Sequence, residues 1–134
     1  MVTYLEQKAA YEMKTVRITN LHRSIKPADI KHNLATLKNV ITATAEAKRI
    51  IREFEPDVAV GTGGYVCFPV LKAASELGVP TAVHESNAVP GLTTKMLEGA
   101  VDTIMVGFEE SRANYKHPDR VKVTGTPVRV DFLS

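Results

Sequence analysis

Three short segments hold the residues of this sequence whose types could do chemistry. The first is glycine-rich and follows a short apolar run; it consists of Gly61, Thr62, Gly63, Gly64 and Tyr65. Glycine leaves the backbone N–H groups unobstructed, and the positive end of the helix expected next would point to the same place. This combination suits a phosphate or diphosphate, although the segment is neither a dinucleotide-binding fingerprint nor a P-loop. The alternative is a tight turn that needs glycine only for its positive φ angles.

The other two segments offer polar side chains. In HESN, His84 and Glu85 could act as general acid or base, and Asn87 could bind a sugar hydroxyl or a carbonyl. The alternative is that Glu85 or Asn87 caps the next helix, while His84 satisfies a buried backbone group. In GTPVR, the guanidinium fork of Arg129 suits phosphate or carboxylate, and the alternative is an ordinary surface arginine.

Cationic residues gather near the start of an expected long helix, with apolar residues among them. They are Arg23, Lys26, Lys31 and Lys38, with Ile30 and Leu34 between them. Lysine and arginine mixed with apolar side chains suit contact with an anionic membrane surface. The alternative is a helix face that only meets water.

The composition limits the class of protein. The chain has 134 residues, of which 44% are hydrophobic and 24% charged, as in one soluble globular domain. A net charge of +2 predicts no nucleic-acid partner.

A single cysteine, Cys67, allows no internal disulfide and fits a reducing cytoplasm. It is expected to be buried as a small apolar residue. The histidines lack zinc-ligand spacing, so no metal site is expected. Neither a membrane span nor a signal peptide is recognisable.

Alternating strands and helices must position the three segments. Strands are expected at residues 13–19, 57–61, 80–85, 102–108 and 121–125. Helices are expected at 3–11, 27–54, 69–77 and 92–97, with a helical turn at 110–114. This alternation predicts an α/β fold with a Rossmann-like parallel sheet and flanking helices. Because ligands bind beyond the carboxyl ends of such strands, we expect the three segments to converge at one edge of the sheet.

Taken together, these segments resemble the MurG family of N-acetylglucosaminyltransferases, which complete the lipid-linked precursor of peptidoglycan. The stretches PDVAVGTGGYV, GVPTAVHESNAVPGLTTKML and VKVTGTPVR are similar to family segments in order and spacing. The stretch AAYEMKTVRITNLHRS is similar to the segment before the family's long helix, so the resemblance covers essentially the whole chain. It implies the N-terminal, acceptor-binding half of a GT-B glycosyltransferase.

The resemblance also implies a reaction without metal or cofactor. N-acetylglucosamine would move with inversion from UDP-N-acetylglucosamine to lipid I, the undecaprenyl-diphosphate-linked muramoyl-pentapeptide, giving lipid II. Residues 61–65 would face the acceptor diphosphate, His84 and Glu85 would line the cleft as candidate catalytic groups, and Asn87 and Arg129 would reach the donor. The basic helix would contact the inner face of the plasma membrane and make the protein peripheral and cytoplasmic.

This sequence departs from the family pattern in two ways. Ser86 stands where many members have glutamine, and Cys67 and Phe68 replace small residues, so Phe68 is expected to crowd the approach to the glycine loop. The family's first strand, its loop GGTGGH and its C-terminal donor domain have no counterpart. Residues 1–134 are therefore expected to be a partial acceptor domain, marginally stable and inactive alone. Alternatives are the membrane-facing subunit of a two-chain transferase, with a separate donor-domain chain, and a non-catalytic diphosphate-binding module.

Overall fold

The computed structural model describes residues 14, 16 and 27–127, with only the backbone for residues 27–38. Its helices are α2 (Pro27–Phe54), α3 (Cys67–Glu76) and α4 (Leu92–Leu97), with the 3₁₀ helices η1 (Glu109–Asn114) and η2 (Pro118–Arg120). Its strands are β1 (Ala59–Gly61), β2 (Thr81–Glu85), β3 (Thr103–Val106) and β4 (Val121–Val123). The expected helix at 3–11 lies outside the described residues, as does the expected strand at 13–19 apart from residues 14 and 16.

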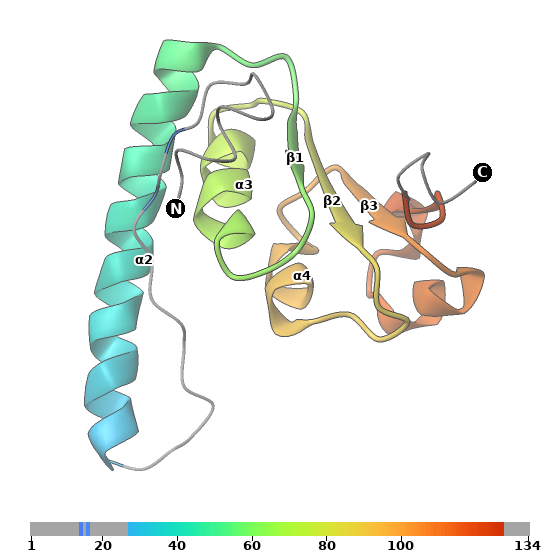
Figure 1. The fold of residues 1–134 in the computed structure, drawn as a ribbon, viewed down its shortest axis with the longest axis horizontal. Helices are drawn as coiled ribbons and strands as arrows, with labels where there is room; N and C mark the ends of the chain where they lie inside the picture. The colour runs from blue at the N-terminus through green and yellow to red at the C-terminus, as the bar shows by residue number, and fades with distance from the viewer. Residues whose placement is uncertain (1–13, 15, 17–26, 128–134) are drawn as a thin grey trace, which may run out of the picture.

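The described strands form one parallel sheet of four strands in the order β1-β2-β3-β4. Val60 on β1 pairs with Ala82 on β2, and Val83 pairs with Ile104 on β3. Helical segments return the chain between successive strands, so all carboxyl ends lie at the same edge, at the lower ends of β1 and β2 in Figure 1. The predicted Rossmann-like α/β fold is confirmed.

On the side of β1 the helices form two layers, because α3 lies between β1 and the long helix α2 (Figure 1). Small residues make this possible: Ala47 of α2 packs with Ala73 and Ala74 of α3. The main core lies between the sheet and helices α3 and α4, and comprises Leu71, Val83, Leu97, Val101, Ile104, Val106, Tyr115 and Val121. Phe68 packs against this core and lines a hollow beside α2, which does not support the expected crowding of the glycine loop.

Two helix ends follow local signals in the sequence. Helix α2 ends at Phe54, directly before Pro56. At the end of α3, the N–H of Gly78 donates to the carbonyl of Ser75 (3.1 Å), and the next N–H donates to that of Ala74 (3.0 Å). With a φ of 75° at Gly78, this is a Schellman motif, and the predicted glycine cap is confirmed.

The remaining boundaries differ in detail from the prediction. Helix α4 has the predicted bounds, whereas α3 begins at Cys67, before the expected start at residue 69. Strands β3 and β4 are shorter than the expected 102–108 and 121–125. The expected turn at 110–114 is the 3₁₀ helix η1, and η2 was not predicted.

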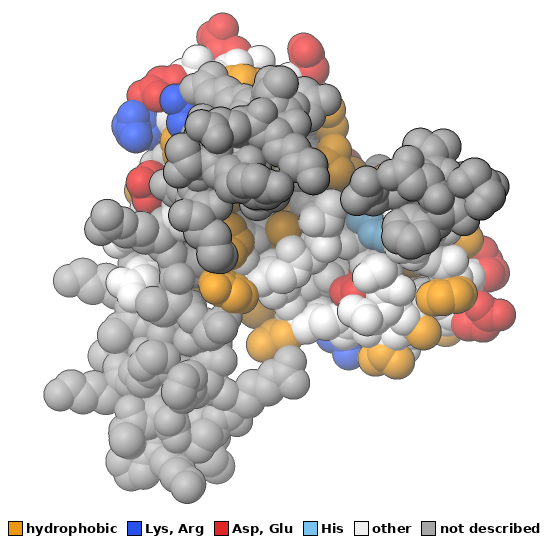
Figure 2. Space-filling view, in the orientation of Figure 1, with side chains coloured by type: hydrophobic (Ala, Val, Ile, Leu, Met, Phe, Trp, Pro, Cys, Tyr) orange, Lys and Arg blue, Asp and Glu red, His pale blue; other side chains and the backbone are white. Residues whose placement is uncertain are grey.

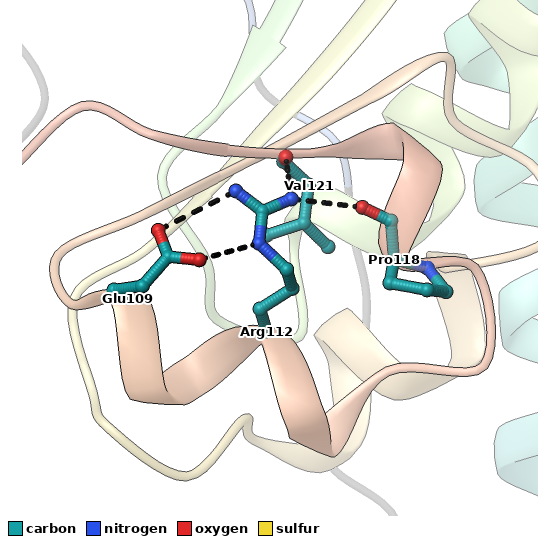
Figure 3. A network of polar contacts seen from close by, with 4 residues as sticks. All are labelled: Glu109, Arg112, Pro118 and Val121. Carbon is teal, nitrogen blue, oxygen red and sulfur yellow. Dashed lines mark hydrogen bonds and ion pairs between the residues drawn. The ribbon is translucent and has the colours of Figure 1, made fainter.

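Arg112 holds the two 3₁₀ helices against the last strand (Figure 3). Its Nε donates to Glu109 Oε1 at 2.8 Å, and its Nη1 donates to the carbonyls of Pro118 at 3.0 Å and Val121 at 2.7 Å. A guanidinium can serve several acceptors at once because its donors are fixed in one plane. This arginine therefore organises the turn that leads into β4, a role that the sequence did not reveal.

Candidate functional site

The carboxyl edge of the sheet brings parts of all three predicted segments together around His84. A Cβ atom on Gly63 would lie 3.8 Å from the carbonyl oxygen of His84, so the glycine loop runs against the end of β2. The Nε2 atom of His84 lies 2.9 Å from the carbonyl oxygen of Gly125, in the segment after β4. Figure 2 views this edge from the side; the part of it that is not covered by grey atoms is mainly white, that is, backbone and uncharged polar groups, with hydrophobic side chains at its lower border. The predicted convergence is present in the described residues.

The glycine loop between β1 and α3 needs its glycines for different reasons. Gly63 and Gly64 have φ angles of 87° and 78°, a region that strains other residues. Gly61 instead allows close packing, because a Cβ atom there would lie 2.7 Å from Leu71 Cδ1. The backbone N–H groups of Gly64 and Tyr65 have no hydrogen-bond partner among the described residues. The loop is thus a tight turn that also leaves donors available to a ligand.

Cys67 fixes this loop from the first turn of α3. Its side chain is half-buried, and its Sγ donates to the carbonyl of Gly63 at 2.7 Å. The prediction of a buried apolar cysteine is confirmed in part: Cys67 packs against the main core, but it is only half-buried and its thiol also contacts the glycine loop.

Glu85 is buried at the end of β2, and both of its carboxylate oxygens are fully engaged. Oε1 accepts hydrogen bonds from the backbone N–H of Asn87 (3.0 Å) and from its side-chain amide (2.7 Å). Oε2 accepts from the N–H of Gly91 (3.0 Å) and from the hydroxyl of Thr94 (2.8 Å). Gly91 is the N-cap of α4, so one carboxylate shapes the loop and supports the helix that follows it.

The same contacts set the ionisation of Glu85. Burial favours the neutral acid, but the hydrogen bonds from Gly91, Thr94 and Asn87 outweigh it and hold the pKa of Glu85 below its ordinary value of 4.5. A general acid or base needs a pKa near the working pH and a free position for the proton. The geometry therefore favours the structural alternative for Glu85 over a catalytic role.

His84 and Asn87 have different surroundings. His84 is 8% exposed, and its ring contact with Gly125 matches the alternative in which it satisfies a buried backbone group. Asn87 is exposed and gives its amide nitrogen to Glu85, while its carboxamide oxygen has no partner among the described residues. Unlike His84 and Glu85, Asn87 therefore has an exposed polar atom that could meet a ligand.

Several predicted residues cannot be placed in the site. Arg129, Arg23 and Lys26 lie outside the described residues, and their roles stay predictions. The predicted membrane residues Ile30, Lys31, Leu34 and Lys38 are on α2, where the backbone alone is described. In the described ranges, no helix has the length and apolar character needed to cross a membrane, and no group of three metal-binding side chains is assembled.

Tyr115 adds a buried hydroxyl near the site that sequence reasoning missed. The side chain is 7% exposed, and its hydroxyl has no hydrogen-bond partner within the described part of the chain. Burial, together with the negative charges of Glu85 and Glu98, raises the pKa of Tyr115 to about 12. The sequence also did not predict that Gly91 and Thr94 donate hydrogen bonds to Glu85, because their spacing carries no signal for binding one carboxylate.

This chain is similar in sequence to a family of glycosyltransferases. The N-terminal domain model of glycosyltransferase family 28 matches residues 1–106. The UDP-N-acetylglucosamine–N-acetylmuramyl-(pentapeptide) pyrophosphoryl-undecaprenol N-acetylglucosamine transferase of Alkaliphilus oremlandii is 42% identical over 133 residues, which are 99% of this chain and 35% of that protein. A protein of the same name from a Thermoanaerobacter species is 42% identical over 132 residues, covering 96% of this chain and 34% of its own length.

The fold has a similar counterpart among solved structures. The crystal structure of Acinetobacter baumannii MurG matches 96% of this chain and 34% of its own length, with a TM-score of 0.70 and 25% sequence identity. The chain thus spans about a third of the length of the relatives it matches. Because the family model covers well over half of its residues, the chain belongs to glycosyltransferase family 28, and the resemblance to MurG enzymes seen in its motifs is confirmed.

Proposed function

We propose that this chain supplies the acceptor-binding part of a transferase that moves N-acetylglucosamine from UDP-N-acetylglucosamine to lipid I. The names of its relatives contain both substrates, a UDP-sugar and a muramyl-pentapeptide joined through pyrophosphate to undecaprenol. The observation that carries the proposal is the glycine loop at the end of β1, which lies against His84 at the carboxyl edge of the sheet.

The loop suits the diphosphate of the acceptor. The N–H groups of Gly64 and Tyr65 are without partners in the described residues, and the first turn of α3 contains no acidic residue. A helix N-terminus carries a partial positive charge, which stabilises a nearby phosphate. The positive φ angles at Gly63 and Gly64 let the backbone approach the ligand without a side chain in between.

The other residues of the site take supporting roles in this proposal. Asn87 presents its carboxamide oxygen toward a sugar hydroxyl on the donor side, where we also place Arg129. Glu85 positions Asn87, and His84 links the ends of β2 and β4. The basic start of α2 would hold the protein at the inner face of the plasma membrane, close to its lipid substrate.

The proposal is tested by binding of a soluble lipid I analogue with a short polyprenyl chain, measured by calorimetry. Gly64→Ala places a methyl group in the loop at a φ of 78°, and Gly78→Ala does the same at 75° at the far end of α3. Neither added Cβ meets an atom within 4 Å, so both variants carry a similar backbone strain of about 1 kcal/mol. We expect Gly64→Ala to weaken binding about tenfold, which corresponds to a loss of about 1.4 kcal/mol of binding free energy. Gly78→Ala should leave binding unchanged.

Two outcomes would count against the proposal. Equal weakening by both variants would show that the effect is a general loss of stability. Binding of free nucleoside diphosphates without preference for the lipid-linked analogue would instead support a non-catalytic diphosphate-binding module.

A further inference from the structure

A hollow of about 410 Å³ lies along α4, on the side where the chain passes from η1 to η2. Its lining residues are Lys95, Glu98, Gly99, Asn114, Lys116 and His117. Most of these are polar or charged, so the hollow suits a polar ligand better than an apolar one.

The charges that face this hollow are mainly positive. Glu98, the one acidic lining residue, is 6% exposed, and its Oε1 already accepts a hydrogen bond from the N–H of His117 at 2.7 Å. Lys95 and Lys116 are exposed, and neither ammonium has an ion pair or hydrogen bond in the described part of the chain. The two positive lysines therefore outweigh one carboxylate that is already occupied.

The C-terminal end of α4 does not cancel this positive character. Free carbonyl groups at the end of a helix carry a partial negative charge. Here the Nη1 of Arg120 donates to the carbonyls of Gly99 at 3.2 Å and Val101 at 3.0 Å, and it lies 3.4 Å from that of Glu98. The arginine compensates these carbonyls, so the two lysines remain available to an anion.

The hollow is connected to the loop that follows β2 in the candidate site. The side-chain amide of Asn114, in the wall of the hollow, donates to the carbonyl of Ala88 at 3.1 Å. Ala88 directly follows Asn87 in the loop that Glu85 organises. Helix α4 lies between this loop and the far end of the hollow. It has 6 residues and is therefore about 9 Å long. An extended peptide of five residues can span about 17 Å, so one that starts at the loop can reach the hollow.

We infer that this hollow is the subsite for the carboxylate end of the acceptor's peptide. The inference rests on the proposed function and adds recognition of the peptide to that of the diphosphate. The acceptor in the relatives' name carries a pentapeptide. A peptide that is attached through its N-terminus ends in a free carboxylate, and ammonium groups bind carboxylates by charge-assisted hydrogen bonds. Lys95 and Lys116 hold this carboxylate, with the imidazole of His117 beside them.

The test compares two soluble lipid I analogues, one with its natural peptide carboxylates and one in which all of them are converted to amides. The unmodified chain is expected to bind the carboxylate form roughly tenfold more tightly, a typical effect of two charge-assisted contacts at a partly exposed site. The double variant Lys95→Ala/Lys116→Ala should bind both analogues with the same affinity. Lys122→Ala removes one positive charge on β4, outside the hollow, and should keep the preference. High salt should reduce the preference, because the contacts are electrostatic.

The possible results separate this inference from the proposed function. If both analogues bind the unmodified chain equally well, the inference is wrong while acceptor binding stands. If the double variant weakens both analogues by the same factor, the lysines act only as general positive charge, and the subsite does not exist. If neither analogue binds, the proposed function fails and the inference fails with it.

Discussion

Glu85 holds Asn87 from two directions, because its Oε1 accepts hydrogen bonds from both the backbone N–H and the side-chain amide of Asn87, at 3.0 and 2.7 Å. Its other oxygen holds the start of α4 through Gly91 and Thr94. One buried carboxylate thus fixes an exposed loop and the helix that follows it. This relationship makes Glu85 a positioning residue and gives the first two predictions.

Replacing Glu85 by glutamine should destabilise the fold. Glutamine keeps one acceptor oxygen but places an NH₂ group where the carboxylate received the N–H of Gly91 or of Asn87. A buried donor that faces another donor costs about 1–3 kcal/mol of the free energy of unfolding. Urea unfolding of Glu85→Gln, followed by circular dichroism, measures this cost. The control Glu110→Gln changes an exposed residue and should shift the value by less than about 0.5 kcal/mol. An equal effect of both changes would contradict the role assigned to Glu85.

The stability of the chain should also depend on Glu85 at acid pH. The pKa of Glu85 is lower in the folded protein than its ordinary value of 4.5, so its contribution is present above that pH and is lost as the pH falls through the folded pKa. The free energy of unfolding should therefore fall more steeply below pH 4.5 in the unmodified chain than in Glu85→Gln. Asp102, whose pKa is also lowered, is present in both proteins, so the difference between the two curves isolates Glu85. Parallel curves would count against the prediction.

Removing the hydroxyl of Tyr115 should change the free energy of unfolding little at neutral pH. The hydroxyl is buried without a hydrogen-bond partner among the described residues, so Tyr115→Phe relieves an unpaired polar group. We expect a free energy of unfolding that is unchanged within about 0.5 kcal/mol or higher. A loss above about 1 kcal/mol would instead reveal a partner such as an internal water molecule. Tyr65→Phe, which removes an exposed hydroxyl, is the control.

The same residue predicts a pH effect on the alkaline side. The pKa of Tyr115 is raised from an ordinary 10.0 to about 12, so in the unfolded chain it ionises first. Its contribution to stability is complete below pH 10.0 and is lost as the pH rises toward 12. Unfolding experiments at rising alkaline pH should show a smaller loss for Tyr115→Phe than for the unmodified chain. The reverse order would refute the assignment of a buried neutral phenol.

A methyl group at Gly61 should disturb the contact between β1 and α3. The new Cβ would lie 2.7 Å from Leu71 Cδ1 and 3.2 Å from Cys67 Sγ, and Leu71 is 1% exposed, with little room to move. Overpacking of this kind costs about 1–3 kcal/mol. Thermal and urea unfolding of Gly61→Ala should show this loss. The control Gly99→Ala places its methyl group in open space and should stay within about 0.5 kcal/mol of the unmodified chain.

The sequence predicted those parts of the fold that depend on neighbours in the chain. The bounds of α2 and α4 and the glycine cap of α3 follow from hydrophobic periodicity, Pro56 and Gly78. The convergence of the polar segments also followed, because parallel strands place all their carboxyl ends at one edge. Strand lengths were overestimated, because a strand ends where its pairing with the neighbour ends and not where its apolar run does.

The tertiary structure alone decided what the polar residues do. The sequence allows Glu85 as a possible acid or base, but four donors from the loop and from α4 saturate its oxygens. Cys67 donates to Gly63 in the glycine loop, and Arg112 joins η1, η2 and β4, through contacts that the residue types do not predict. Residue types and their periodicity determine which elements form and which groups reach the edge of the sheet. The partner of each buried polar group depends on which elements pack together, and this is settled only when the chain folds.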